Sequence, residues 1–358
     1  MVRTFVAVLI ALPTSALADE SRSTPVVNGF DYTYGHASVV DPPMDVLLGD
    51  AERLRAWVRA NRGPLIAPIE NVPSMTPLRV KDDGWKAASP EYDLLKVTAE
   101  YAADHPLNGH NIGALVARPT AVDPRKPLII ALHGHEIGHR GDPPVKLWEE
   151  NWWPTKLARA GYVVITPSHL PYTQLGSLYV DHDYHAVWTR LVWDLVTATL
   201  NAPSAIPPYE GMAVAGLSSG GTTGALLLAW RPEVRQGVLA GSLLPLEFLR
   251  QNYRWTGQPN SWDLRNVYSY LPYYLLFADQ RVQWQMGKKD DFFPGTGPIA
   301  PAPAFPGTDR DVMTSEPLGD FLSMREAASK LGGHAELFIH DEGHVFRASA
   351  AVRFLSQQ

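Results

Sequence analysis

The sequence predicts an α/β fold in which a mostly parallel central sheet carries helices on both faces. From residue 92 onward, short apolar runs alternate with helical patterns. The runs at 128–132, 212–217 and 237–241 are the unbroken apolar kind that is typical of strands buried on both faces of a parallel sheet. Right-handed crossovers then place the intervening helices on the two faces.

The order of elements follows from these patterns. Residues 94–101 and 110–117 flank the turn at 106–109 and predict a β-hairpin. Further strands are expected at 128–132, 162–166, 212–217, 237–241, 282–286 and 335–339. Helices are expected at 147–160, 184–200, after residue 218, at 316–331 and at 345–355. The catalytic domain is therefore assigned to residues 92–358, with an aromatic-rich insertion at 246–280 that we interpret as a lid or substrate wall.

The chain before this domain divides into two parts. Residues 1–18 read as a cleavable secretory signal, with Arg3, an apolar core from Phe5 to Leu12 and the small-x-small site Ala16-Leu17-Ala18. The apolar core is much shorter than the ~20 residues of a membrane anchor. Residues 19–91 are rich in proline and contain one amphipathic helix pattern near residues 50–60, which predicts an extension packed on the main domain.

Composition excludes some classes of function. The formal net charge is −6 and the chain has no lysine- or arginine-rich runs, so nothing points to nucleic acid or to an anionic membrane as a partner. The absence of cysteine excludes a cysteine nucleophile and thiolate metal ligands. An exported protein without disulfides, as in a periplasm or outside the cell, must be stabilised by its core.

One serine lies where a strand meets a helix. Gly216-Leu217-Ser218-Ser219-Gly220 matches the G-x-S-x-G nucleophile elbow, in which a strained turn lifts a serine hydroxyl above a sheet. The motif alone also fits an ordinary glycine loop. The apolar run before it and the helical pattern after it favour the elbow.

Two further groups follow later strands. Asp290 comes after the strand at 282–286 and His344 after the strand at 335–339, so Ser218, Asp290 and His344 occur in the order expected of a catalytic triad on this sheet. Imidazole can take the serine proton, and a carboxylate orients the imidazole. The rival acids are Asp291 and Asp279, and the rival base is His340.

From about Tyr92 to its end, the chain resembles the α/β-hydrolases. Four segments are similar to those of the dienelactone hydrolase and acetyl xylan esterase-like branches. They are Leu132-His133-Gly134-His135, Gly216 to Gly221, Gly287-Lys288-Lys289-Asp290 and Gly343-His344. The resemblance implies ester hydrolysis without a metal or other cofactor. It also implies an oxyanion hole formed by the backbone N–H of Ser219 and that of His135 or Glu136. Glu136 and Ile137 depart from the glycines of many relatives, which leaves the second donor open.

The same loop supports an alternative. His135-Glu136-Ile137-Gly138-His139 matches H-E-x-x-H, in which two histidines on one helical face bind zinc, with Glu149 or Glu150 available as a third ligand. Gly134 and Gly138 disfavour a helix, and Pro143-Pro144 would end it. We therefore predict no metal site.

Substrate contacts are expected from residues that follow strands or lie in the insertion. Tyr172, His185, Trp255 and Trp262 are the candidates. Core packing of the tryptophans and helix capping around Asp181–His185 are the alternatives. Together these features predict an exported serine esterase acting on a small-molecule or carbohydrate-linked ester through an acyl-enzyme, with a peptidase on the same scaffold as the alternative.

Overall fold

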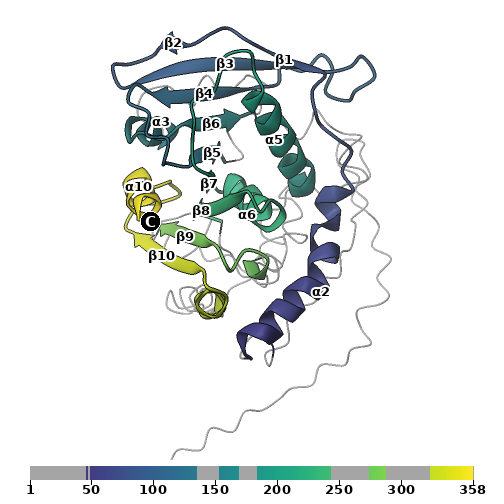
Figure 1. The fold of residues 1–358 in the computed structure, drawn as a ribbon, viewed down its shortest axis with the longest axis vertical. Helices are drawn as coiled ribbons and strands as arrows, with labels where there is room; N and C mark the ends of the chain where they lie inside the picture. The colour runs from purple at the N-terminus through teal and green to yellow at the C-terminus, as the bar shows by residue number, and fades with distance from the viewer. Residues whose placement is uncertain are drawn as a thin grey trace, which may run out of the picture.

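The structure, a computed structural model, describes Val46 and residues 49–134, 153–168, 184–242, 274–287 and 323–357. Its centre is a ten-stranded sheet in the order β1-β3-β4-β6-β5-β7-β8-β9-β10, with β2 paired to β3 (Figure 1). The strands are β1 (Arg79–Asp82), β2 (Lys86–Ala87), β3 (Tyr92–Glu100), β4 (Gly113–Pro119), β5 (Leu128–Leu132), β6 (Val164–Pro167), β7 (Met212–Leu217), β8 (Val234–Ala240), β9 (Arg281–Gly287) and β10 (His334–His340).

The sheet is parallel from β6 through β5, β7, β8 and β9 to β10, and antiparallel from β1 to the β4–β6 pair. The predicted hairpin is confirmed, since β3 and β4 pair antiparallel. The strands predicted from apolar runs are also confirmed, and β5 is buried at all five positions. A strand buried along its whole length must have cover on both faces of the sheet.

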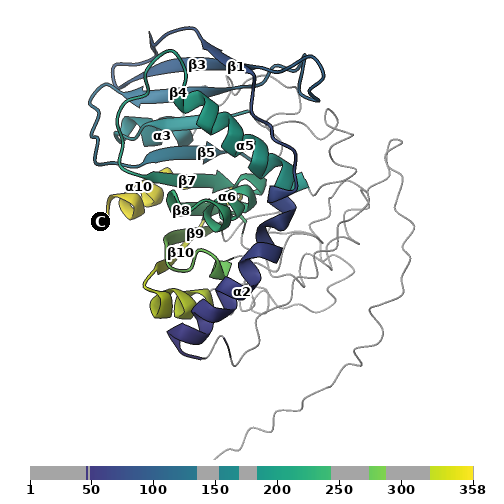
Figure 2. The same ribbon diagram turned by 45° about the vertical axis from the view of Figure 1, so that its right-hand side comes forward.

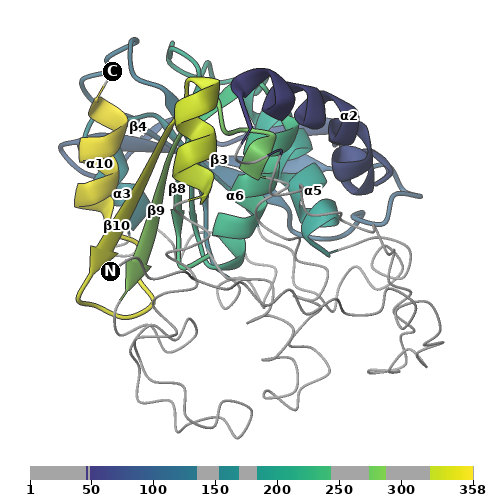
Figure 3. The same ribbon diagram turned by 90° about the horizontal axis from the view of Figure 1, so that it is seen from below.

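Helices cover both faces (Figures 1 and 3). They are α2 (Ala51–Glu70), α3 (Trp153–Arg159), α5 (Tyr184–Leu200), α6 (Ser219–Trp230) and α10 (Ala348–Ser356). The apolar residues of α2, α5 and α6 share one core cluster with residues 274–278 and 324–328. Those of α3 and α10 form a second cluster on the opposite face. The three-layer α/β architecture expected from the sequence is therefore confirmed.

The strand order places a crevice at a defined point. The chain passes from β5 to β6 on one side of it, then returns through α5 to β7 on the other side. The β5–β6 and β6–β7 crossovers therefore run in opposite directions along the sheet, and ligands of open α/β sheets bind at the carboxyl ends of the strands where this direction reverses. His133 and Ser218 are the residues that follow these two strands.

The segment before residue 92 contributes more regular structure than its sequence indicates. Helix α2 is longer than the pattern at 50–60, and β1 and β2 add to the sheet by pairing with β3. Neither strand has a buried residue, so no apolar alternation announces them. Figure 2 shows α2 on the same side as α5 and α6, and Arg62 donates a hydrogen bond to the Trp230 carbonyl at 3.2 Å. No described helix is both long enough and apolar enough to cross a membrane.

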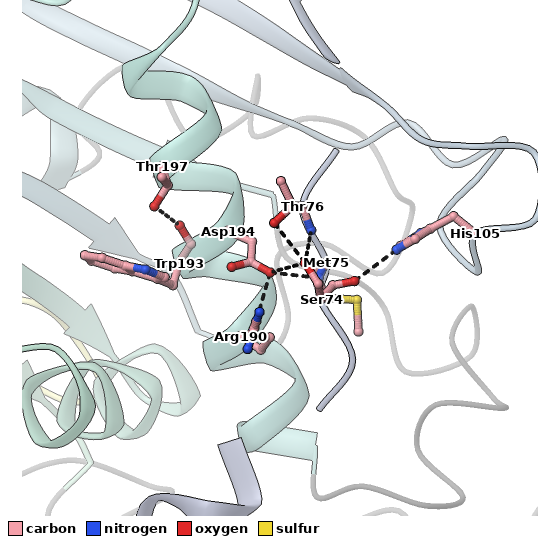
Figure 4. A network of polar contacts seen from close by, with 8 residues as sticks. All are labelled: Ser74, Met75, Thr76, His105, Arg190, Trp193, Asp194 and Thr197. Carbon is pink, nitrogen blue, oxygen red and sulfur yellow. Dashed lines mark hydrogen bonds and ion pairs between the residues drawn. The ribbon is translucent and has the colours of Figure 1, made fainter. Parts of the chain in front are cut away.

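A buried carboxylate fastens residues 74–76 to α5 (Figure 4). One oxygen of Asp194 accepts the Met75 backbone N–H at 2.7 Å and the Arg190 Nε–H at 2.9 Å. Nearby, the Ser74 carbonyl lies 3.3 Å from His105 Nε2. A buried N–H that loses its acceptor carries the full desolvation penalty, so Asp194 stabilises the attachment of this segment.

We expect Asp194→Ala to lower the free energy of unfolding by about 2–3 kcal/mol, since it leaves the Met75 N–H buried and unpaired. Thr197→Ala is the matched control on the same helix, because the exposed Thr197 hydroxyl bonds only the Trp193 carbonyl within α5. It should change stability by less than about 0.5 kcal/mol. Urea unfolding measures both variants, and equal losses would contradict the assignment.

Candidate active site

Ser218 occupies a strained turn between β7 and α6. Its φ of 58° and ψ of −126° make it the one non-glycine residue with positive φ in the described part of the chain. Such a conformation persists only where the surroundings hold it. The Ser218 N–H donates to the Ala240 carbonyl of β8 at 2.8 Å, and the Ser218 carbonyl accepts from Gly221 N–H at 2.8 Å and Thr222 N–H at 3.2 Å.

Close backbone contacts explain the flanking glycines. A Cβ atom on Gly216 would lie 2.2 Å from the Gly220 carbonyl oxygen. One on Gly220 would lie 2.3 Å from the Leu132 oxygen and 2.5 Å from the His133 oxygen. The elbow therefore packs backbone to backbone against the end of β5, and no side chain fits at either position.

The end of β5 also borders Ser218. A Cβ atom on Gly134 would lie 3.2 Å from Ser218 Cβ and 3.9 Å from Ser218 Oγ. Ser219 is the first residue of α6, where backbone N–H groups have no helical partner and favour negative charge. An oxyanion formed at Ser218 would lie between these two segments. His135 and Glu136, the candidates for the second donor, lie outside the described residues.

His133 is a buried neutral histidine at this junction. Its side chain is 3% exposed, and Nδ1 lies 2.8 Å from the Gly134 carbonyl oxygen. Because a carbonyl can only accept, Nδ1 carries the hydrogen. Burial lowers the pKa of His133 from 6.5 to about 4, which the bond to Gly134 only partly opposes.

The turn that bears His344 leans over the end of β9. A Cβ atom on Gly287 would lie 2.2 Å from the Gly343 oxygen and 2.5 Å from the Glu342 oxygen. Asp290 follows Gly287 by three residues, and both it and its rival Asp291 lie outside the described residues. Asp279 precedes β9 and so lies at the opposite edge of the sheet from Ser218.

The two candidate bases differ in exposure. His340 is the last residue of β10, pairs in register with Gly287 and is 8% exposed. His344 lies in the turn beyond the strand and is partly exposed. A base that must meet both a serine hydroxyl and a substrate requires such access.

The predicted substrate contacts fall in two groups. His185 is 5% exposed at the start of α5, with Nδ1 3.5 Å from the Thr223 hydroxyl of α6. It therefore contacts the elbow helix one turn beyond Ser218. Tyr172, Trp255 and Trp262 lie outside the described residues, as does most of the predicted insertion.

The metal alternative rests on residues beyond the described ones. No group of three or more histidine, aspartate or glutamate side chains that could hold a metal occurs among the described residues. His135, Glu136 and His139 of the H-E-x-x-H match are not among them.

Comparison with solved structures identifies the architecture. No family model matches the sequence, and no curated protein matches it. A glucuronoyl esterase from Teredinibacter turnerae superposes with a TM-score of 0.57 at 12% identity, covering 92% of this chain and 92% of that one. The chain has an α/β-hydrolase fold.

Two other solved structures share this fold. A glucuronoyl esterase from Solibacter usitatus gives a TM-score of 0.56 at 12% identity over 86% of this chain and 93% of that one. A candidate acetyl xylan esterase from Bacteroides fragilis gives a TM-score of 0.54 at 14% identity, over 82% of this chain and 77% of that one. The resemblance drawn from the sequence segments is confirmed at the level of the fold.

Some site residues escaped sequence reasoning. Ser242 follows β8, is 2% exposed, and its Oγ would lie 2.4 Å from a Cβ on Gly221. Gln283 and Gln285 lie within β9 and are each 1% exposed. Two glutamines at alternate positions of an otherwise apolar strand are the signal that could have revealed this buried polar pair.

We expect Gly220→Ala to lower the free energy of unfolding by about 3 kcal/mol or more, because its methyl group would overlap two carbonyl oxygens of the β5 end. Gly63→Ala is the control, since no atom outside its chain neighbours and its own helix backbone lies within 4 Å of a Cβ there. Alanine favours the helix more than glycine does, but its methyl group crowds Pro64. These effects oppose one another, so the free energy of unfolding of this control should stay within about 1 kcal/mol of the wild type. Thermal unfolding compares them, and a stable Gly220→Ala protein would refute the close contact.

The depressed pKa of His133 predicts a stability change in acid. Between pH 6.5 and about 4 the unfolded chain protonates this ring and the folded chain does not, so stability falls as pH drops through that window and this group contributes no slope above it. Across the whole window, the loss in free energy of unfolding from this group is about 3 kcal/mol. His133→Asn keeps a donor for Gly134 but cannot titrate. Urea midpoints between pH 7 and 4.5 should therefore fall less steeply for this variant than for the wild type.

Proposed function

We propose that this protein is a serine hydrolase of carboxylic esters that works through an acyl-enzyme, with Ser218 as nucleophile, His344 as general base and Asp290 as the orienting acid. The strained elbow carries the proposal. It sets Ser218 at the switch point of an α/β-hydrolase sheet, beside the end of β5 and ahead of the first turn of α6.

The chemistry follows from these positions. Ser218 Oγ attacks the ester carbonyl while the His344 imidazole takes its proton. The new oxyanion is stabilised by the Ser219 N–H and by a second N–H from residue 135 or 136, and each such donor is worth ~10²–10³ in rate. His344 then returns the proton to the leaving alcohol, and water, activated in the same way, releases the acid and restores Ser218. No metal enters these steps.

A chain of backbone and side-chain contacts supports the approach of His344 to Ser218. Three strand spacings, roughly 14 Å, separate β7 from β10, so the base must reach back toward the centre of the sheet. Ser218 N–H bonds Ala240 of β8, Gly241 N–H bonds the Gln285 carbonyl of β9 at 2.9 Å, and the Gln285 side chain bonds the Arg347 backbone. The backbone at Arg347, just past the turn, therefore lies against β9.

The partial exposure of His344 favours it over His340 as base. We place the substrate among small-molecule or carbohydrate-linked esters, because structures of the same fold are described as glucuronoyl and acetyl xylan esterases. We also propose that residues 1–18 direct export and are removed, which would place the enzyme in the periplasm or outside the cell.

A fluorophosphonate should add one phosphonyl group to the mature protein, and peptide mapping should place it on Ser218. The same intact mass reports whether the chain begins at Asp19. Ser218→Ala should lose the adduct and at least about 10⁴-fold in kcat for p-nitrophenyl acetate, and His344→Ala should lose a similar factor. The control His340→Asn should keep kcat within about tenfold.

Other outcomes would decide against this assignment. Hydrolysis that persists in Ser218→Ala but stops with a chelator would favour the zinc alternative at His135 and His139. Faster turnover of aminoacyl anilides than of esters would favour the peptidase.

A further inference from the structure

Two glutamines interrupt the buried apolar strand β9. Gln283 and Gln285 are each 1% exposed and flank the buried Trp284. Buried amides cost free energy unless each donor and acceptor is paired. The hydrogen-bond partners of Gln283 and Gln285 therefore indicate why amide side chains occur in this strand.

The Gln285 amide holds both backbone groups of one residue. Its Oε1 accepts the Arg347 N–H at 2.7 Å, and its Nε2 lies 3.1 Å from the Arg347 carbonyl. The side chain thus pairs with the chain as a neighbouring strand would. Arg347 follows His344 by three residues and is the N-cap position of α10.

Three other contacts fix the same turn. The Gly343 carbonyl packs against Gly287, and the Phe346 ring stacks on Trp153 of α3 with centroids 4.1 Å apart. The Glu342 and Arg347 side chains form an ion pair across the turn. These contacts hold the residues on both sides of His344, and Figure 3 shows α10 beside β9 and β10 at this point.

A carboxylate determines which way the amides face. Gln283 Nε2 donates to Glu336 Oε1 at 2.6 Å, and an ionised carboxylate can only accept. Gln283 Oε1 must then face Gln285, whose Nε2 donates to it at 2.9 Å. This leaves Gln285 Oε1 to accept the Arg347 N–H. The polarity that starts at Glu336 thus matches the orientation of the Gln285 amide that the Arg347 N–H itself requires.

We propose that Gln285 is a positioning residue for His344, acting through its two hydrogen bonds to the Arg347 backbone. The inference rests on the proposed function, in which His344 is the base. Gln285 touches neither substrate nor the reacting atoms. Its effect is to keep the backbone at Arg347 where the imidazole meets Ser218, since small displacements of a catalytic group cost large factors in rate.

Gln285→Met tests this, because methionine fills similar volume but offers no strong donor or acceptor. We expect kcat for p-nitrophenyl acetate to fall about 10–100-fold with KM within about threefold, and the rate of fluorophosphonate labelling of Ser218 to fall in parallel. Gln283→Met is the matched control, with the same strand, face and burial. It leaves both Arg347 bonds in place and should keep kcat within about threefold of the wild type. Its melting temperature should fall by about as much as that of Gln285→Met.

Three results would overturn the inference. They are an unchanged kcat in Gln285→Met, an equal fall of kcat in both variants, or a loss that appears in KM alone. If Gln285→Met does not fold, Gln285→Asn, whose amide is too short to reach Arg347, replaces it with the same expectations. Failure of the proposed function is seen separately, as a wild-type protein that is neither labelled at Ser218 nor active on esters.

Discussion

The fold depends on one close approach, the packing of the elbow backbone against the end of β5. Gly220 allows this contact, since a methyl group there would overlap the Leu132 and His133 carbonyl oxygens, and Gly216 allows the turn to close on the Gly220 carbonyl. The positive φ of Ser218 is maintained because its N–H and carbonyl are both bonded, to β8 and to the first turn of α6. Every residue of α6 from Gly220 to Trp230 is buried, so hydrophobic burial offsets the strain of the turn.

This contact also determines where chemistry can occur. With the elbow against β5, the Ser218 hydroxyl lies at the one edge of the sheet where crossovers diverge. The first turn of α6 and the segment after His133 then border it from two sides. The turn that bears His344 starts three strands away, so its position depends on contacts with β9, through Gly287 and Gln285. Ser218 and His344 thus belong to separately stabilised parts of the sheet edge.

The sequence predicts those parts of the fold that depend on burial and period. β5 and β7 are apolar along their length, and α5 was predicted at Tyr184–Leu200, where it lies. β1 and β2 could not be predicted, because neither buries a residue and both exist through pairing with β3. Ser218 was proposed from the G-x-S-x-G spacing between an apolar run and a helical pattern, and it lies in a positive-φ turn between β7 and α6. Gln285 was missed because its partner, the Arg347 backbone, is 62 residues away and leaves no local pattern.

The distribution of buried polar side chains distinguishes the two edges of the sheet. Strands β5, β6, β8 and β10 each place one at or just past the carboxyl end, namely His133, Ser168, Ser242 and His340, and β9 carries Gln283 and Gln285 within the strand. The buried residues at the amino ends, such as Leu128, Val164, Val234 and Val282, are apolar. Among the described residues, the Ser242 hydroxyl has no hydrogen-bond partner, which costs about 1–3 kcal/mol. Buried polar side chains are costly unless they are paired, so their placement near the carboxyl ends of these strands is a feature of the core that fits the site proposed at Ser218.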